Sequence, residues 1–404
     1  MNKYIDIVIL FGFPLLIIAV FRIISKGWVK ISSGQAIFFI GFVLFCSWSL
    51  ISYFWVGQSE DSTRKIIQMV FIGGSSILII KGLFNDRSKI ERFLIISVVI
   101  GIVFGSYELL KIKHHLSVQP LGGEGGYQWL SLITYVAFVI SLVYMLHFNV
   151  ISKKVSLFLI LFILLFGMIK GGARQAVFAS LFSILYLFYL YIFSGGLRKL
   201  NIKQFWIYTI SGFFITCFIY LTFKTQLEIL LNTRGANRIF KFLNLTFFGD
   251  IASISELSGR SVVFSDAWHI FMQKPILGCG FGAFRDYAST NIWSHPHNVF
   301  LEVLSELGII GLILFMIIII PVLLKLLNVN LVKNSIHLRV LGAIIIGYLA
   351  IMMTSGNLGS NRLLFAFITM FLIAYHREKI RKRYLHNKSF SAKINMTNLY
   401  GKKH

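Results

Sequence analysis

The chain has 404 residues, of which 57% are hydrophobic and only 13% are charged. Soluble domains carry about 25% charged residues, so this composition excludes an ordinary soluble domain and indicates a helical membrane protein. The net charge of +24 is typical of nucleic-acid binding, but we expect no nucleic acid, because the basic residues lie mostly in short loops and in the tail, where they set orientation in a membrane.

The apolar runs predict an all-α polytopic membrane protein with about eleven transmembrane helices, within a range of ten to twelve. Each run must be helical, because lipid offers no hydrogen-bond partner to an exposed backbone amide. The first run has no small-residue cleavage site and is therefore expected to be a span rather than a signal peptide. In chain order the predicted spans are 4–22, 35–56, 66–83, 93–110, 128–148, 155–169, 175–193, 205–223, 298–323, 339–354 and 361–375.

These spans divide the chain into four parts. Residues 1–223 form an N-terminal bundle, 224–297 a large loop, 298–375 the C-terminal helices and 376–404 a basic tail. The loop is far longer than an ordinary connection, which indicates a function. It contains an amphipathic piece at 237–248 and a helix-like piece at 261–272. We expect no internal repeat and no interrupted span, a pattern that argues against a transporter.

Basic residues predict the orientation of the spans. Most of them fall in the loops on one side and in the tail, which makes that side cytoplasmic. The opposite, periplasmic side receives the loop with Glu60 and Asp61, the loop with His114 and His115, the turn K-G-G-A-R and the large loop. Eleven spans would also place the N-terminus on that side.

A polar segment runs from His295 into an apolar helix. Pro296 predicts the first turn of that helix, so His297 and Asn298 would sit at its positive end, which favours a neutral imidazole and a nearby anion. Asn298, Glu302 and Ser305 share one helical face, which we expect to point into the protein. The alternative is that His297 only hydrogen-bonds at a helix end.

Three arginines are candidates for binding an anion. Arg260 precedes the helix-like piece, Arg174 lies in the K-G-G-A-R turn, and Arg362 lies in S-G-N-L-G-S-N-R. A guanidinium group matches phosphate oxygens. The alternatives are lipid-headgroup binding for Arg260, a tight turn with a snorkelling side chain for Arg174, and a snorkelling anchor for Arg362, which is favoured there. No carboxylate cluster or His/Cys set with metal spacing accompanies them. The pattern therefore favours metal-independent handling of a pyrophosphate.

The glycines and cysteines of the chain suggest no cofactor. Gly278, Gly280 and Gly282 lack the strand that a nucleotide-binding fingerprint requires, so we expect tight backbone packing there. The cysteines are odd in number and far apart, which argues against a disulfide framework or a zinc site. They are Cys46, Cys217 and Cys279.

The motif S-G-R, then P-I-L-G-C-G-F-G-A-F and H-P-H-N-V-F-L-E-V-L-S-E-L-G-I-I-G, resembles the signature of the O-antigen ligase and Wzy-type polymerase superfamily. The resemblance implies a GT-C-like glycosyltransferase in the bacterial inner membrane, with its active site at the periplasmic face. The family's functional arginines and histidine would fall on Arg174, Arg260 and His297. Asn298, Glu302, Arg362 and His295 are then candidates for substrate binding.

The resemblance also implies the substrates. The donor would be an oligosaccharide on undecaprenyl pyrophosphate, and no cofactor, nucleotide sugar or metal would be needed. The acceptor would be another lipid-linked repeat unit in a polymerase, or the lipid A core in a ligase; we favour the polymerase. Further partners would be membrane lipids and a chain-length regulator. A flippase or transporter of lipid-linked oligosaccharides is the alternative from another class, and a structural membrane anchor is a third.

Overall fold

The protein is described by a computed structural model that covers residues 7–25, 31–56, 59–84, 86–110, 126–148, 150–171, 174–195, 260–290, 292–354 and 357–400. Every regular element in these ranges is a helix, which confirms the predicted all-α class. The predicted span 205–223, the amphipathic piece 237–248 and the loop with His114 and His115 lie outside the described residues.

The helices follow the predicted apolar runs. The first half contains α1 (Ile7–Ser25), α2 (Ser33–Ile51), α3 (Tyr53–Val56), α4 (Glu60–Ile66), the π-helix η1 (Ile67–Gly73), α5 (Gly74–Leu83), α6 (Arg87–Leu110), α7 (Gly126–His147), α8 (Ile151–Gly171) and α9 (Arg174–Phe193). The second half contains α14 (Arg260–Gln273), α15 (Phe284–Tyr287), α16 (Val299–Leu326), α17 (Val329–Val332), α18 (Ile336–Met352) and α19 (Leu363–Tyr400).

Among the described residues, seven helices are long and apolar enough to cross a membrane. Gly12–Ser25 and Ile336–Met352 are shorter apolar helices. The protein is therefore a polytopic membrane protein, while the count of eleven spans stays a prediction.

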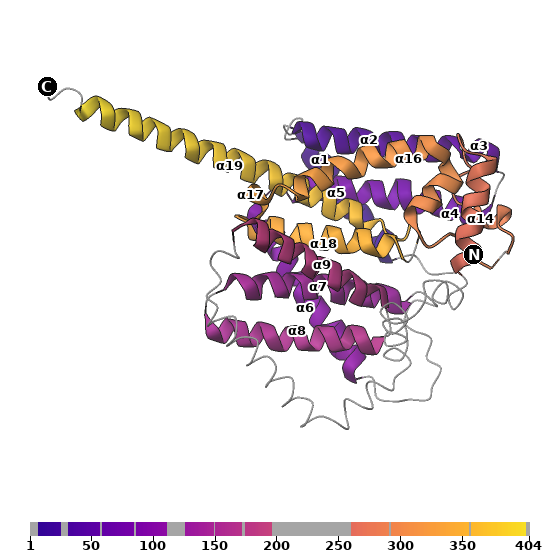
Figure 1. Ribbon diagram of the computed structural model, residues 1–404, viewed down its shortest axis with the longest axis horizontal. Helices are drawn as coiled ribbons and strands as arrows, with labels where there is room; N and C mark the ends of the chain where they lie inside the picture. Colours follow the sequence, from indigo (N-terminus) through magenta and orange to yellow (C-terminus); the bar gives the residue numbers. More distant parts are fainter. Residues whose placement is uncertain are drawn as a thin grey trace.

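Helix α18 lies at the centre of the bundle (Figure 1). It packs against α7 and α9 on one side and against α19 on the other. Apolar residues such as Leu341, Ile344 and Ile345 are fully buried along it, as expected for a helix that is hydrophobic all round. Around it, α6, α7 and α8 pack together, α1 packs on α5, and α2 packs on α16.

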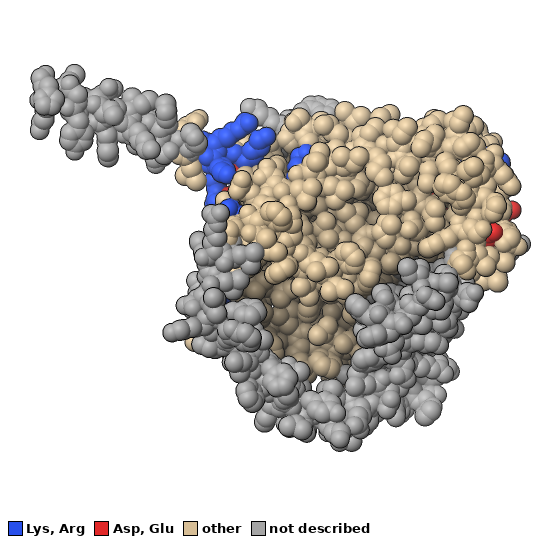
Figure 2. Space-filling model, viewed as in Figure 1, with Lys and Arg blue, Asp and Glu red and all other residues tan. Residues whose placement is uncertain are grey.

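The two ends of the bundle differ in charge. Lys and Arg side chains gather where α19 leaves the bundle, and acidic side chains are seen at the opposite end (Figure 2). At the first end, Arg377 pairs with Asp86 at 3.5 Å, and the Arg339 guanidinium lies 3.1 Å from Nδ1 of His147. We call this the basic end, and the opposite one, where α16 begins and α18 finishes, the site end. The separation follows the predicted grouping of the basic loops; its assignment to the cytoplasm stays a prediction.

Helix α16 is broken near its start, so the prediction of uninterrupted spans was wrong. Gly308 has φ 65° and ψ −163°, a conformation that glycine alone readily adopts. Groups freed by the break find partners: the Trp48 indole donates to the Leu307 carbonyl at 3.1 Å, and the Ile309 amide donates to the Pro275 carbonyl at 2.9 Å. The π-helix η1 is a second irregularity, between α4 and α5.

Candidate functional site

The His-Pro-His-Asn segment leads into α16 at the site end. The helix begins at Val299, and Asn298 is its N-cap, with the side-chain oxygen accepting the amides of Phe300 and Leu301 at 3.0 and 3.2 Å. The prediction that Pro296 opens the helix, with His297 and Asn298 in its first turn, was therefore wrong. The reason is the left-handed backbone of His297, with φ 56°, which cannot continue a helix.

His297 is held in a strained backbone conformation. It is the one non-glycine residue with positive φ in the described part of the chain, and such a conformation costs about 1–3 kcal/mol unless its surroundings impose it. Its ring meets Trp293 and His295 edge-on, with centroid distances of 5.0 and 4.2 Å. Strain of this kind often accompanies function, and here it falls directly before the N-cap of α16.

His295 is a neutral group under ordinary conditions. Burial lowers its pKa well below the usual value, and the electrostatic effects of the neighbouring His297, Lys65 and Arg285 lower it further. Its Nδ1 lies 3.0 Å from the Ser294 hydroxyl. Its buried Nε2 has no hydrogen-bond partner among the described residues. His295 is therefore suited to hydrogen-bonding a substrate, not to binding an anion as a cation.

The glycines at 278, 280 and 282 form a tight turn against α16, as predicted. Their φ values are 72°, 108° and 85°, a region that other residues avoid. The Gly280 amide donates to the Glu306 carbonyl at 2.7 Å, and the Cys279 amide donates to the Ser305 carbonyl at 2.9 Å. A Cβ atom on Gly282 would lie 2.6 Å from Cα of Ser62. The turn thus fits between α4 and the first turns of α16.

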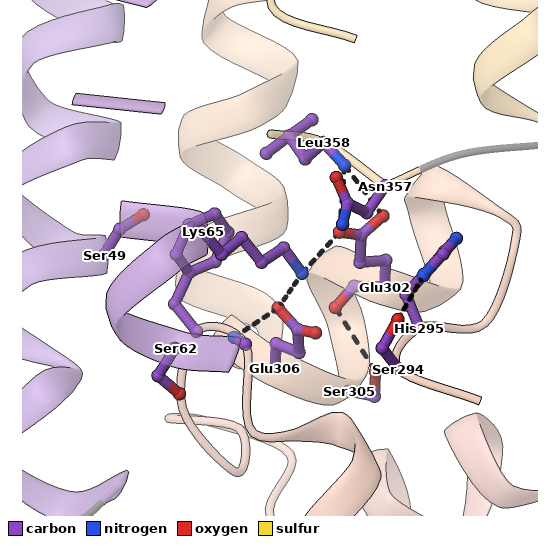
Figure 3. Close-up of polar contacts among 12 residues, drawn as sticks. Ser49, Ser62, Lys65, Ser294, His295, Glu302, Ser305, Glu306, Asn357 and Leu358 are labelled. Carbon is purple, nitrogen blue, oxygen red and sulfur yellow. Dashed lines mark hydrogen bonds and ion pairs between the residues drawn. The ribbon is translucent and has the colours of Figure 1, made fainter. Parts of the chain in front are cut away.

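Lys65 of α4 reaches between two carboxylates of α16 (Figure 3). Its Nζ lies 2.5 Å from Glu302 Oε1 and 2.5 Å from Glu306 Oε2, and all three side chains are buried. Glu302 also accepts the Leu358 amide at 3.0 and 3.2 Å, and Glu306 accepts the Gly282 amide at 2.8 Å. Glu302 and Ser305 are buried, which confirms that the predicted polar stripe faces the interior.

Lys65 and Glu306 were not among the predicted site residues. The predicted span began at residue 66, so Lys65 was assigned to a charged loop, whereas α4 begins at Glu60. The missed signal was the spacing of Glu302 and Glu306 on one face of an apolar helix, because two buried carboxylates require a buried cation.

The backbone of Arg174 lies at the site end. It is the first residue of α9, which packs antiparallel to α18, with Ser183 donating to the Ala343 carbonyl at 2.7 Å and Tyr186 lying beside Gly342. Arg174 precedes Ser183 by nine residues (183 − 174), and Met352 follows Ala343 by nine (352 − 343). The first turn of α9 is therefore level with the end of α18. At that end the side-chain amide of Asn298 donates to the Met353 carbonyl at 3.5 Å.

The segment of Arg260 lies beside the histidines. Arg260 is the first residue of α14, which packs on α16. One turn further, Val263 belongs to a buried apolar cluster against which Trp293 packs, and Trp293 contacts His297. The side chains of Arg174 and Arg260 lie outside what the structure describes. At the level of the backbone, the three predicted catalytic residues occupy segments of one end of the bundle.

Arg362 belongs to the turn that joins α18 to α19. Its Nη1 contacts the Gly359 carbonyl at 3.4 Å. Gly359 abuts Gln68 of η1, because a Cβ atom there would lie 2.7 Å from the Gln68 side-chain oxygen. Since Leu358 of the same turn binds Glu302, Arg362 is on a segment tied to α16. Substrate binding by Arg362 stays a prediction.

Within the described ranges, no group of three or more His, Cys, Asp or Glu side chains is placed to hold a metal ion. The acidic groups nearest the site are already engaged: Glu302 and Glu306 bind Lys65, and Asp61 pairs with Arg285 at 3.1 Å. Metal-independent chemistry stays a prediction of the sequence.

Comparison with known families identifies a match in this region. The model of the O-antigen ligase family matches residues 157–316. The matched range includes Arg174, Arg260, His297 and Glu302, and leaves out Lys65 and Arg362. No curated protein matches the chain. The match confirms the resemblance to the O-antigen ligase and polymerase superfamily that the sequence motif indicated.

Proposed function

Since the model of the O-antigen ligase family matches residues 157–316, we propose that this protein is a membrane-embedded glycosyltransferase that polymerises lipid-linked repeat units of O-antigen or a related surface polysaccharide. Its donor is an oligosaccharide on undecaprenyl pyrophosphate, and its acceptor is a hydroxyl of a second repeat unit. The reaction takes place at the site end, which faces the periplasm of a bacterium with this protein in its inner membrane.

The conformation of His297 is the observation that carries the proposal. His297 has a left-handed backbone, its ring packs edge-on against Trp293, and it lies directly before a helix N-cap. Strain at such a position is typical of a residue that contacts a ligand. A neutral imidazole there is suited to removing a proton from a hydroxyl group. The His295 ring lies 4.2 Å from the His297 ring, centre to centre, and remains neutral, so it supports the acceptor through a hydrogen bond.

The reaction is a single displacement. The acceptor oxygen attacks the anomeric carbon of the donor sugar while the bond from that carbon to the pyrophosphate oxygen breaks. The bonding electron pair leaves with the pyrophosphate, and the hydroxyl proton passes to His297. Arg174 and Arg260 bind the pyrophosphate and stabilise the charge that grows on it. The anomeric configuration is inverted.

The remaining residues serve the site in different ways. Asn298 fixes the start of α16 through its cap, and Arg362 offers a further positive charge from the 357–362 turn. Glu302 acts through its neighbours, because Lys65 and the Leu358 amide already occupy its carboxylate. A divalent cation is not required, since the arginines supply the positive charge. We expect EDTA to leave the rate of polymer formation unchanged, and a loss restored by Mg²⁺ would exclude this mechanism.

Two alternative functions would use the same region of the chain. A ligase would transfer the glycan to the lipid A core with the same donor chemistry. A flippase would move the donor without joining it. The break in α16 removes one argument against a transporter, because interrupted helices are common in that class. The family match and the strained histidine still favour an enzyme.

The glycan profile of a strain that lacks this protein tests the proposal. Loss of the polymer ladder, with one repeat unit kept on the core, supports a polymerase. Loss of all glycan from the core, with polymer still on the carrier lipid, supports a ligase. Accumulation of single repeat units on the cytoplasmic leaflet supports a flippase. Expression of the wild-type chain from a plasmid is the matched control.

A further inference from the structure

The cluster formed by Lys65, Glu302 and Glu306 is costly to bury. The exposed fractions of the three side chains are 5%, 1% and 0%. Removing charges from water costs several kcal/mol per ion, and mutual attraction often fails to repay that cost. Apolar side chains would fill the same space with less penalty. A role in stability alone therefore does not account for the cluster.

The cluster joins four separate segments. Lys65 belongs to α4, and Glu302 and Glu306 lie one turn apart on α16. Glu306 holds the glycine turn through the Gly282 amide at 2.8 Å, and Glu302 holds the 357–362 turn through the Leu358 amide at 3.0 Å. The Lys65 ammonium group also lies 4.7 Å from the centre of the Phe281 ring. Figure 3 shows the Lys65 ammonium group bound to both carboxylates and the Leu358 amide bound to Glu302.

Two of the joined segments lead to groups of the proposed site, and the glycine turn is tied back to α4. Helix α16 begins at Asn298, directly after His297. The 357–362 turn carries Arg362. The glycine turn leads to Arg285, whose guanidinium pairs with Asp61 on α4 at 3.1 Å. A shift of any one segment at the cluster moves the groups that would contact the donor or the acceptor.

We propose that the Lys65–Glu302–Glu306 cluster is a positioning element that fixes the glycine turn, the start of α16 and the 357–362 turn in the arrangement required for glycosyl transfer. This inference rests on the proposed function. Lys65 lies outside the matched region, and Glu302 and Glu306 lie inside it. The cluster therefore ties the family region to the N-terminal helices of this chain.

Cys279 provides a direct readout of the turn. Its side chain is 0% exposed, and burial raises the pKa of its thiol, so a maleimide reagent should label it slowly. Its amide is bound to the Ser305 carbonyl, one residue before Glu306. Release of the glycine turn exposes this thiol, whereas loss of a catalytic group does not. Cys46→Ala and Cys217→Ala provide a background in which Cys279 is the one remaining cysteine.

The test compares Lys65→Met and Glu306→Gln in that background. We expect each to label Cys279 at least about tenfold faster and to lower the rate of polymer formation by at least about tenfold. Lys65→Met leaves two buried carboxylates without their cation, and Glu306→Gln replaces charge-assisted hydrogen bonds to the Lys65 ammonium group and the Gly282 amide with weaker neutral ones. Matched controls are Lys154→Met and Glu60→Gln, which change exposed residues of the same types. His297→Ala should abolish polymer formation and leave Cys279 protected.

The outcomes separate the two proposals. Unchanged Cys279 labelling in a folded Glu306→Gln protein, or faster labelling with an undiminished rate, would overturn the positioning role. If the wild type forms no polymer, the proposed function fails, while the labelling still reports whether the cluster holds the turn. If Lys65→Met does not accumulate in the membrane, Glu306→Gln gives the reading, because it keeps the shape of the side chain and weakens both hydrogen bonds made by Oε2 of Glu306.

Discussion

The break in α16 makes the substitution Gly308→Ala a sharp test of the structure. Gly308 has φ 65° and ψ −163°, and a Cβ atom there would overlap the carbonyl group of Ile276 and lie 2.8 Å from the Leu277 nitrogen. The alanine methyl group therefore meets backbone that cannot rotate away. The turn from Pro275 to Leu277 would have to move, and the glycine turn follows it directly.

The expected cost has two parts. The backbone conformation alone costs about 1–3 kcal/mol for a residue other than glycine. Displacing the turn also breaks the hydrogen bond from the Ile309 amide to the Pro275 carbonyl, which is worth about 1 kcal/mol. We therefore expect Gly308→Ala to destabilise the protein by at least about 3 kcal/mol, since the overlap adds to both.

Two other glycines separate these contributions. Gly12 lies inside α1 with open space around it, so Gly12→Ala should stabilise the protein by about 0.5–1 kcal/mol. Gly195 has φ 81° and open space, so Gly195→Ala carries a backbone cost of about 1–2 kcal/mol without overlap.

The thermal stability of the three variants is compared in detergent. Size-exclusion chromatography of heated samples gives the midpoint of unfolding of each variant. We expect Gly12→Ala to be the most stable, Gly195→Ala intermediate and Gly308→Ala the least, with a drop of several degrees for the last. A Gly308→Ala protein as stable as Gly12→Ala would show that α16 is continuous and would refute the described break.

Three further predictions concern the His-Pro-His-Asn segment. Asn298→Ala should lower stability by about 1 kcal/mol through loss of the N-cap, whereas Asn298→Asp should retain it, as unfolding midpoints would show. His297→Gly and His297→Ala should both abolish polymer formation, but the glycine variant should be more stable by about 1 kcal/mol, because glycine adopts the left-handed backbone freely; equal midpoints would contradict the strain. The lowered pKa of His295 means that the unfolded chain binds a proton that the folded chain does not, so stability should fall as pH drops through about 6.5. His295→Asn should flatten this dependence in unfolding midpoints measured from pH 7.5 to 5, and an unchanged slope would exclude a buried neutral imidazole.

The helices could be predicted from sequence because lipid imposes one rule on every span. Each predicted run except 205–223, which is not described, coincides with a helix. The errors occur where a local rule competes with tertiary contacts. The charged stretch before residue 66 looked like a loop, yet α4 begins at Glu60 after the Ser59 N-cap, and its Lys65 has partners about 240 residues further along the chain.

Other features depend on contacts that no local pattern reveals. The apolar run through Gly308 favours a continuous helix, and the break exists because Trp48 and Pro275 bind the freed backbone groups. Pro296 favours a helix start, but the Asn298 cap and the left-handed His297 delay it. By contrast, the tight turn at Gly278, Gly280 and Gly282 followed directly from glycine spacing.

The candidate site could be predicted in part. The motif selected His297 and the arginine segments, and the helix directions bring these segments to one end of the bundle. The motif did not reveal the ion cluster behind them, because Lys65 is remote in sequence and outside the matched family region. The catalytic roles of Arg174, Arg260 and His297 stay predictions.

Elongation by the purified protein tests the central claim most directly. The protein is reconstituted in liposomes with a synthetic undecaprenyl pyrophosphate-linked repeat unit, and products are resolved by gel electrophoresis and mass spectrometry. We expect a ladder of joined units from the wild type, no ladder from His297→Ala or Arg260→Ala, and an unchanged ladder from Lys154→Met. A His297→Ala protein that elongates at the wild-type rate, or a wild type that leaves every repeat unit unjoined, would contradict the account.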